Sequence, residues 1–375
     1  AFDPVETRHT TSWDMLRNGV DLGGAYPANP RAAENLSTVL ACVGAISSAM
    51  ASLPAYVYRF DGAGRSIDDR HPVAKLIEAP NQHQTWSDFV EWTMASVLLR
   101  GNALAEILTD TMGAVIGLHP IPWENVSVQL LRNGRLVYDI TDITYLGGGS
   151  GLPRRLLQDE VFHLRDRSDD GLIGVSRLRR AAAVVQAGIS IQNFANALYL
   201  NGANPSGALE VDGKLSDQAR EHLRQSFKEA FSGSSNAAKT LILESGISWK
   251  QISVNPEDAE FLASRRFTTE ELARIFNVPP VIVGDLSHAS FTNSETLLRW
   301  FAQSTLSPWI KKVESEFSRS VFTESTRRTH KLEIDLSGLL RGDPAQRWAA
   351  WKIAVEANIL TPNEVRLEEG WNPIG

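Results

Sequence analysis

The residues of this 375-residue chain that could perform catalysis are a histidine and an aspartate near a glycine-rich segment. His163 and Asp166 stand in the run HLRD, shortly after the segment LGGGSGLP at 146–153. A histidine that a carboxylate orients can act as a general base in a hydrolase or a transferase. Such an enzyme also needs an activated nucleophile, and nothing near this run supplies a nucleophile motif. We therefore predict that the protein is not an enzyme and keep an α+β hydrolase as an alternative only.

The glycine-rich segment does not have the sequence of a phosphate-binding loop. Such a loop needs Gly-Lys followed by Ser or Thr at the start of a helix. Here Ser150 is followed by Gly151, Leu152 and Pro153, so no lysine is available to contact a phosphate. The sequence argues against nucleotide binding at this segment.

The other histidines and the single cysteine do not form a pattern typical of a metal site. The scattered histidines have no cysteine or glutamate at a diagnostic spacing: His71, His83, His119 and His163. His288 likewise has no orienting partner, so we predict hydrogen-bonding roles for these side chains. Cys42 stands alone in the apolar run TVLACVGAI, which excludes a disulfide framework and fits a reducing compartment. We expect no metal and no cofactor.

The overall composition is that of a globular protein with a slight acidic excess. The chain is 43% hydrophobic and 22% charged, and its length fits two or three domains. Its 37 Lys and Arg against 44 Asp and Glu give a formal net charge of −7, which argues against tight phosphate binding. No window approaches the ~18 consecutive apolar residues of a membrane span, and the start AFDPVETRHT does not resemble a signal peptide. We expect a soluble protein that lets any nucleic acid partner pass along it.

Hydrophobic spacing predicts the elements of the first half. Residues 1–33 show no sustained periodicity and are predicted to form an extended N-terminal arm. Residues 34–175 combine a helical stripe that Pro54 ends with alternating strands. Within them VSVQLL and LVYDI flank RNGR, where Asn133 and Gly134 predict a hairpin with a type I′ turn. This part is therefore predicted to be a mixed α+β domain.

The middle of the chain has the pattern of two helices around a small module. Residues 176–202 carry two offset apolar stripes interleaved with Ala and Gly, which predicts a long helix that packs on both flanks. Residues 203–255 combine strand-like runs with one helix and are predicted to be an α+β module without charge bias. Residues 256–280 are predicted to be helical until Pro279 and Pro280 end the helix.

A polar loop and a kinked helix are predicted after the double proline. Residues 281–293 have no periodicity of their own, which is typical of a functional loop. Residues 294–340 begin as a striped helix that Pro308 is predicted to kink, and residues 341–375 are predicted to be mainly helical. Capping residues predict several helix starts, among them those at Thr85, at Thr292 with Glu295, and at Thr361 with Glu364.

Several runs, in this order, resemble the portal proteins of tailed double-stranded DNA bacteriophages of the siphophage type. They are DGLIGVSRLRRA at 170–181, NGANPSGALE at 201–210, ARIFNVPPVIVGDL at 273–286, SETLLRWFAQSTLSPWIKKVESEF at 294–317 and ILTPNEVR at 359–366. The resemblance covers roughly residues 34–372. It implies a ring, dodecameric in virions, at one capsid vertex, through which DNA is packaged and ejected.

The resemblance also implies a portal fold with named parts and partners. These parts would be an arm at 1–33, the wing at 34–175, stem helices at 176–202 and 256–280, the clip at 203–255, the tunnel loop at 281–293, the kinked wing helix with a return strand at 294–340, and a short helical crown at 341–375. The implied partners are further copies of the chain, double-stranded DNA passing without sequence specificity, the terminase large subunit, the head–tail adaptor protein and the major capsid protein. No membrane is involved, and the protein would be found in the virion and, during assembly, in the host cytoplasm.

Three groups of residues follow from this resemblance as candidate functional residues. The tunnel loop would line the DNA channel with hydroxyl, imidazole and amide groups, which contact a phosphate backbone without choosing a sequence: Ser287, His288, Ser290, Thr292 and Asn293. The subunit-packing residues of the stem would be Val184, Ala187, Gly188, Ile191 and Phe194. The partner surface of the clip would comprise Lys214, Arg220, Arg224, Lys239 and Lys250. A non-portal structural or adaptor protein of the same particle remains an alternative, and a phage, a prophage and a gene transfer agent would all fit.

Overall fold

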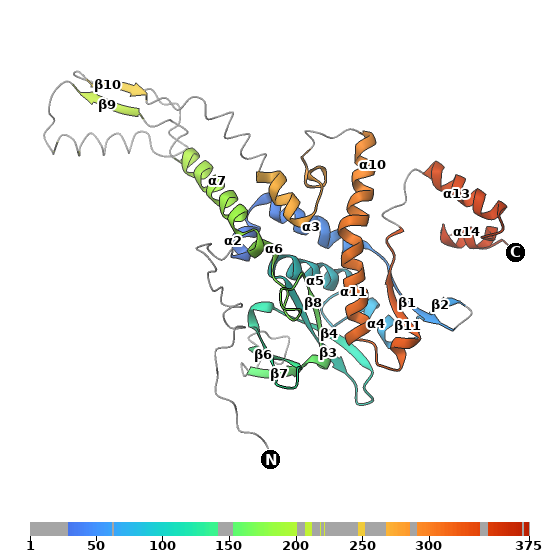
Figure 1. Cartoon of the computed structure of the whole chain (residues 1–375). Coiled ribbons are helices and arrows are strands. Elements are labelled where there is room, and N and C mark those ends of the chain that lie inside the picture. Colours follow the sequence, from blue (N-terminus) through green and yellow to red (C-terminus); the bar gives the residue numbers. More distant parts are fainter. Residues whose placement is uncertain are drawn as a thin grey trace, which may run out of the picture. The chain divides into compact units, whose positions relative to one another are not determined.

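The computed structural model describes residues 29–61, 64–141, 153–200, 207–211, 218, 221, 247–251, 268–285, 291–337, 344–369 and 371–374. The chain divides into two compact units, each formed by separate stretches of sequence: 1–41 with 177–276, and 42–176 with 277–375. Helices and antiparallel strands occur in both, which agrees with the predicted α+β class (Figure 1). No helix among the described residues has the length and apolar character needed to cross a membrane.

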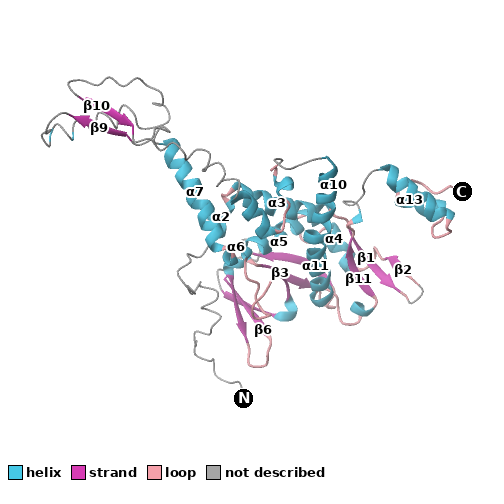
Figure 2. Cartoon of the chain, turned by 45° about the horizontal axis from the view of Figure 1, so that its top comes forward, coloured by secondary structure: helices cyan, strands magenta, loops and turns pink. Residues whose placement is uncertain are grey.

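The first unit combines helices with one antiparallel strand pair (Figure 2). Its labelled elements are α2 (Pro30–Glu34), the start of α3 (Ser37–Ser52), α6 (Arg177–Arg180), α7 (Ala182–Leu200), β9 (Gly207–Val211) and β10 (Ile247–Gln251). A further helix covers residues 268–276. The Asn29 side chain accepts a hydrogen bond from the Arg31 N–H (3.0 Å) and Pro30 follows it, so a cap and an N-terminal proline start α2. The last residues of the predicted extended arm are therefore helical.

The predicted long helix at 176–202 is present as α6 followed by α7. Ala181 lies between them, and its carbonyl accepts hydrogen bonds from the N–H groups of Val184 and Val185. Gly188 lies on the buried side of α7, where a Cβ atom would be 3.2 Å from Leu36 Cδ1 and 3.3 Å from Thr268 Cγ2. Even a methyl group at this position would require these two side chains to shift by a few tenths of an ångström, so glycine lets α7 pack closely against its own chain.

The second unit contains three antiparallel sheets of three strands each, in the orders β11–β1–β2, β4–β3–β8 and β5–β6–β7. The strands are β1 (Ala55–Phe60), β2 (Arg65–Ile67), β3 (Asn102–Thr109), β4 (Val115–Ile121), β5 (Val126–Leu130), β6 (Leu136–Thr141), β7 (Pro153–Leu157), β8 (Val161–Arg165) and β11 (His330–Ile334). The helices include α4 (Pro72–Glu78), α5 (Trp86–Arg100), α10 (Phe291–Trp300), the π-helix η6 (Phe301–Leu306), α11 (Ser307–Ser320), α13 (Pro344–Glu356) and α14 (Pro362–Glu368). Short 3₁₀ turns are η1 (Trp123–Asn125), η3 (Gln158–Glu160), η5 (Pro280–Val283) and η7 (Thr326–Arg328).

Of the helix starts predicted at Thr85, Thr292 and Thr361, two are confirmed. Thr85 caps α5, and its hydroxyl accepts the N–H of Asp88 (3.2 Å) in a reciprocal capping box. Thr361 caps α14 in the same way. The third prediction is wrong, because α10 already begins at Phe291 and Thr292 lies inside its first turn rather than before it.

The predicted hairpin at 126–141 is confirmed, but its turn is not type I′. A type I′ turn needs positive φ at both central residues. Gly134 has φ 80°, whereas Asn133 is not among the described non-glycine residues with positive φ. The N–H of Gly134 instead donates to Leu131 O (2.9 Å), which closes a turn before the left-handed glycine. The five residues between β5 and β6 allow this longer connection, which is why the two-residue prediction fails.

Helix α11 packs against the edge strands of two sheets in the second unit. The Glu316 carboxylate accepts a hydrogen bond from the backbone N–H of His163 in β8 (3.0 Å), and Lys312 Nζ donates to Arg165 O in the same strand (2.9 Å). Glu314 accepts from the backbone N–H of Ile334 in β11 (3.0 Å). Polar backbone groups at sheet edges need partners when they are covered, and α11 supplies them from its side chains.

Aromatic side chains fill the space beneath α11. The Phe317 ring centroid lies 5.7 Å from that of Trp86 in α5 and 5.0 Å from that of Phe162 in β8. These three side chains are buried, so α11, α5 and β8 share one apolar core.

Replacing Glu316 should test how strongly α11 depends on this carboxylate. In Glu316→Leu the half-buried Arg319 and the buried N–H of His163 both lose their acceptor, so we expect the free energy of unfolding to fall by about 1–3 kcal/mol. Glu316→Gln keeps an acceptor and should lose less. Ser315→Ala, a change at an exposed position on the same helix, should stay within about 0.5 kcal/mol of wild type in urea titrations. Wild-type stability of Glu316→Leu would contradict this role.

Candidate functional site

The predicted kinked helix after the polar loop is a helix with a π segment in its middle. Helix α10 leads into the π-helix Phe301–Leu306, and α11 follows without a break. The N–H of Ser307 donates to Ala302 O, five residues back, which is the bond of a π-helix. Pro308 stands in the first turn of α11, so the predicted site of distortion is correct and its form is a π segment.

The start of the predicted loop is ordered by short-range turns. Pro279 and Pro280 begin the 3₁₀ turn η5, which ends at Gly284 with φ 90°. The N–H of Asp285 then donates to Pro280 O (3.0 Å). The chain next leaves the described residues at 286–290, so the predicted channel residues Ser287, His288 and Ser290 lie outside them.

The other two predicted channel residues, Thr292 and Asn293, belong to the first turn of α10. The helix therefore begins before the predicted cap at Thr292 and inside the predicted loop 281–293. Along α10 the side chains of Leu298 and Trp300 remain 44% and 42% exposed. Large apolar side chains at this exposure are available for contact with another surface.

The five predicted packing residues of the stem lie on different sides of α7. Gly188 is buried against its own chain, as described above, and Val184 and Ile191 are half-buried. Ala187 is exposed, and Phe194 is 57% exposed. The predicted set therefore contains one buried residue, two half-buried residues and two exposed residues.

The predicted partner residues of the clip are mostly outside the described part of the chain. Lys214, Arg220, Arg224 and Lys239 fall in the gaps of the described ranges. Lys250 belongs to β10, where its backbone pairs with Ala208 of β9. Their role as a surface stays a prediction.

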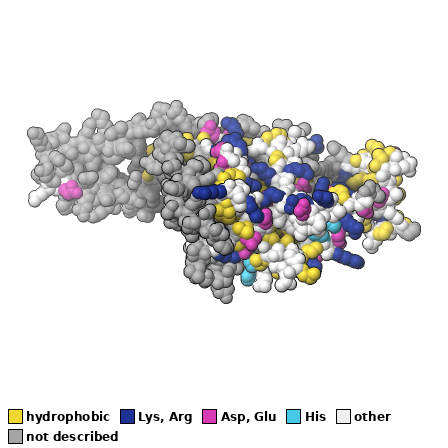
Figure 3. All heavy atoms as spheres, turned by 60° about the horizontal axis from the view of Figure 1, so that its bottom comes forward, with side chains coloured by type: hydrophobic (Ala, Val, Ile, Leu, Met, Phe, Trp, Pro, Cys, Tyr) yellow, Lys and Arg dark blue, Asp and Glu magenta, His cyan; other side chains and the backbone are white. Residues whose placement is uncertain are grey.

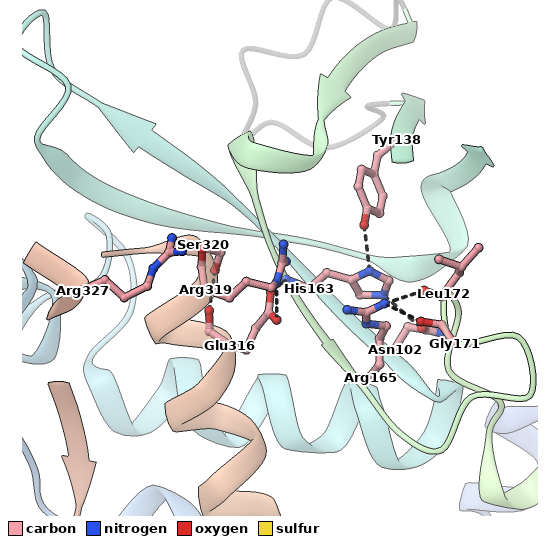
Figure 4. Close-up of polar contacts among 10 residues, drawn as sticks. All are labelled: Asn102, Tyr138, His163, Arg165, Gly171, Leu172, Glu316, Arg319, Ser320 and Arg327. Carbon is pink, nitrogen blue, oxygen red and sulfur yellow. Dashed lines mark hydrogen bonds and ion pairs between the residues drawn. The ribbon is translucent and has the colours of Figure 1, made fainter. Parts of the chain in front are cut away.

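His163 lies in a buried hydrogen-bond network and not in a catalytic arrangement (Figure 4). Asn102 donates through Nδ2 to Gly174 O (2.8 Å), and its Oδ1 accepts the Gly174 N–H (2.8 Å), which fixes the orientation of the amide. The Oδ1 atom therefore accepts from His163 Nε2–H (3.0 Å), and His163 Nδ1 accepts from the Tyr138 hydroxyl (2.9 Å). Both ring nitrogens are in use, so the imidazole has no position left for a substrate.

The electrostatics of this network keep His163 neutral. Burial, with smaller contributions from Arg165 and Arg319, lowers the pKa of His163 well below its usual 6.5. Burial also raises the pKa of Tyr138 to about 12, so its hydroxyl remains a donor. Asp166, the other half of the catalytic alternative, is buried with Lys312 Nζ 3.9 Å from its carboxylate. These residues stabilise the fold and do not support a hydrolase site.

His71 and His330 also make contacts that stabilise the fold. His71 accepts the Val73 N–H through Nδ1 (3.2 Å) and caps α4. The ring of His330 lies beside it at a tilt of 31°, with the centroids 4.6 Å apart, and His330 Nε2 lies 3.2 Å from an Asp68 carboxylate oxygen. Among the described residues no group of three or more His, Cys, Asp or Glu side chains is arranged to hold a metal ion.

Charges on the described surface are mixed in sign. Figure 3 shows Lys and Arg side chains spread over one face, with Asp and Glu side chains among them. Arg154 contacts Glu106 through two 2.7 Å hydrogen bonds, and Arg155 contacts Asp139 at 2.7 Å. Pairing of this kind reduces the positive potential that would hold a phosphate backbone.

Sequence reasoning missed the residues that hold the π segment. Asn277 and Thr305 exchange hydrogen bonds across 28 positions of sequence, and neither was a predicted site residue. A signal was present, because asparagine is one of the few residues that readily adopts the left-handed conformation at the end of a helix. It stands directly before Val-Pro-Pro, where the helix was predicted to end.

Comparison with known proteins identifies related chains. The family model described as phage portal protein matches residues 37–370. The portal protein of Enterobacteria phage HK97 is 33% identical, with 90% of this chain and 79% of that protein covered. The probable portal protein of Streptomyces phage phiC31 is 26% identical, with 100% and 83% covered.

Solved structures share the fold. A chain from the neck of a native gene transfer agent particle, computed with C12 symmetry, superposes with a TM-score of 0.58 at 23% identity, covering 94% of this chain and 97% of that chain. A HK97-family phage portal protein from Corynebacterium diphtheriae superposes with a TM-score of 0.60 at 17% identity, covering 84% and 99%.

Acid should destabilise the protein through His163. The folded state lowers the pKa of this group, so its contribution to stability is fully present above pH 6.5 and is lost as the pH falls below that value. As the pH falls below 6.5 we expect the free energy of unfolding to decrease, because the neutral imidazole of the folded state takes up a proton less readily than that of the unfolded chain.

The His163 contribution can be isolated by urea titrations at several pH values. His163→Gln should be less stable than wild type near neutral pH, and its stability should depend less steeply on pH. His83→Gln, at an exposed position, should reproduce the wild-type pH profile. Equal slopes for wild type and His163→Gln would show that another group causes the acid sensitivity.

Proposed function

Because the chain belongs to the phage portal protein family, we propose that its copies form a ring at a unique capsid vertex, through which double-stranded DNA is packaged and ejected. The observation that carries this proposal is family membership over almost the whole chain, residues 37–370. The same role would serve a tailed phage or a gene transfer agent particle. A hydrolase is not favoured, since His163 is neutral, buried and fully hydrogen-bonded.

The ring is proposed to close through contacts along α7. A cyclic ring needs two different surfaces on each subunit, because one surface contacts the preceding subunit and the other contacts the following subunit. One side of α7 is buried within its own unit, while Ala187 and Phe194 are exposed on the helix. An exposed phenylalanine beside small residues is suited to a close subunit contact. The related neck structure has C12 symmetry, so a ring of twelve copies is the expected state.

The proposed parts of the ring follow the sequence segments. Residues 176–202 and 256–280 would form the stem, 203–255 the clip, 281–293 the tunnel loop, 294–340 the kinked wing helix and its return strand, and 341–375 the crown. The crown segment is supported by the helices α13 and α14, where Glu369 accepts hydrogen bonds from Arg347 (2.7 Å) and Trp351 Nε1 (2.8 Å).

The proposed partners are the terminase large subunit and then the head–tail adaptor at the clip, and the major capsid protein around the ring. DNA would pass without sequence specificity. With −7 on each copy, a ring of twelve would carry a formal charge of −84. An acidic ring repels the anionic duplex, which reduces adhesion during movement. The protein would reside at the capsid vertex and, before assembly, in the host cytoplasm.

Negative-stain images of the purified chain test the ring directly. We expect ring-shaped particles with a central hole under assembly conditions. Solid particles or isolated subunits would contradict the portal role, and would favour a non-portal adaptor of the same particle.

Ala187→Trp should reduce the fraction of rings, because overpacking costs about 1–3 kcal/mol at every subunit contact. Gln186→Ala, at the neighbouring exposed position, is the matched control. Unchanged rings with Ala187→Trp would place the subunit contact elsewhere.

Deletion of Ser287–Ser290 tests the tunnel loop. The ring should still assemble, because the deleted residues lie outside the proposed stem contact, while DNA packaging or retention should fall. A packaging assay that measures protected DNA per particle gives the readout. Wild-type packaging and retention with the shortened loop would refute its assignment to the channel.

A further inference from the structure

Asn277 combines an unusual backbone conformation with contacts to the π segment. It directly follows the helix at 268–276 and has φ 60°. Among the described residues, only Asn277 and Asn358 are non-glycine residues with positive φ. Asparagine adopts this left-handed conformation more readily than most residues, but glycine does so at lower cost. An asparagine at such a position therefore indicates that its side chain makes a contact that glycine could not make.

The side chain of Asn277 satisfies a carbonyl that proline leaves without its α-helical partner. In an α-helix the carbonyl of Ser304 would accept from the N–H of residue 308, and Pro308 has no N–H. Asn277 Nδ2 donates to this carbonyl instead (3.0 Å). The hydroxyl of Thr305, a residue only 3% exposed, donates to Asn277 O in return. Asn277 and the end of the π segment are thus joined by reciprocal hydrogen bonds.

A π segment contains one more residue than the α-helical path between the same ends, and this extra residue can lie at different positions along a helix. In an α-helix each residue turns by about 100° and rises by 1.5 Å. If the extra residue moved from η6 to the start of α10, every residue of α10 would turn by about 100° relative to α11. The position of the extra residue therefore sets the rotation of α10.

We propose that Asn277 is a positioning residue that holds the extra residue at 301–306 and thereby fixes the rotational setting of α10. Loss of its contacts to Ser304 and Thr305 lets the π segment move towards Phe291 and turns the helix. The turn changes which side chains α10 exposes, including Leu298 and Trp300. Helix α10 starts at Phe291, directly after residues 286–290 in the sequence. A role for this rotation in a DNA channel rests on the proposed function. The effect of Asn277 on the rotation of α10 does not depend on that function.

Variants at both ends of the contact separate the side-chain contacts from backbone strain. Asn277→Gly keeps the left-handed backbone accessible and removes the amide. Thr305→Val removes the hydroxyl and keeps nearly the same shape. Asn358→Gly makes the same exchange at the other described left-handed asparagine, and is the matched control.

Distance measurements between spin labels on the full-length purified chain report the rotation. Labels at Arg299→Cys on α10 and Ser315→Cys on α11 lie on opposite sides of the π segment, and both positions are exposed. The native Cys42 is buried and its pKa is raised to about 12, so it should not react with the label. We expect one distance in the otherwise native chain and in Asn358→Gly, and a second distance to appear in Asn277→Gly and Thr305→Val.

Hydrogen exchange gives an independent readout. Amides over 296–307 should exchange about tenfold faster in Asn277→Gly, since a stabilising hydrogen bond is lost, and at the native rate in Asn358→Gly. Deleting Gln303, an exposed residue inside η6, removes the extra residue. In that background Asn277→Gly should add no second distance.

Two outcomes would overturn the proposal: a single unchanged distance with native exchange in both Asn277→Gly and Thr305→Val, or a second distance that persists after Gln303 is deleted. Circular dichroism melting of each variant shows whether the chain is folded during these measurements. The distance and exchange measurements involve neither DNA nor rings, so they test the role of Asn277 independently of the proposed ring.

Discussion

The second unit depends on the way α11 satisfies the edges of two sheets. Glu316 and Lys312 bond a backbone N–H and a carbonyl of β8, and Glu314 bonds an N–H of β11. Four residues of helix rise by about 6 Å, close to the ~6.6 Å between alternate residues of a strand. The side chains of one helical turn therefore match successive outward-facing groups of β8. This match fixes α11 along the strand, and the π segment and α10 continue from it.

Most elements whose cause is local were predictable from the sequence, with the cap at Thr292 as an exception. The capping boxes at Thr85 and Thr361 and the distortion before Pro308 each depend on a few neighbouring residues, and each is present. The turn type at Asn133 failed because turn geometry depends on the loop length, which the strand ends decide. The contacts of Glu316 and Asn277 could not be predicted, since they join residues 153 and 28 positions apart.

The candidate site residues divide in the same way. Their roles were predicted from runs of sequence that resemble a protein family, but the surroundings of each side chain depend on tertiary packing. Gly188 and Ala187 are neighbours in sequence, yet one packs against its own chain and the other is exposed. His163 beside Asp166 had the composition of a catalytic pair, whereas burial made it a neutral member of the core. Sequence alone does not show which side of a helix is already occupied.

The close contact at Gly188 brings α7 together with Leu36 and the helix at 268–276 within the first unit. Leu36, Thr268 and Leu272 all lie within 3.7 Å of where its missing methyl group would be. An alanine here requires the side chains of Leu36 and Thr268 to shift by a few tenths of an ångström, and a larger residue requires one of these side chains to lose volume. Evolution at these four positions is thus expected to proceed by compensating pairs, with larger residues on α7 accompanied by smaller ones at 36, 268 or 272.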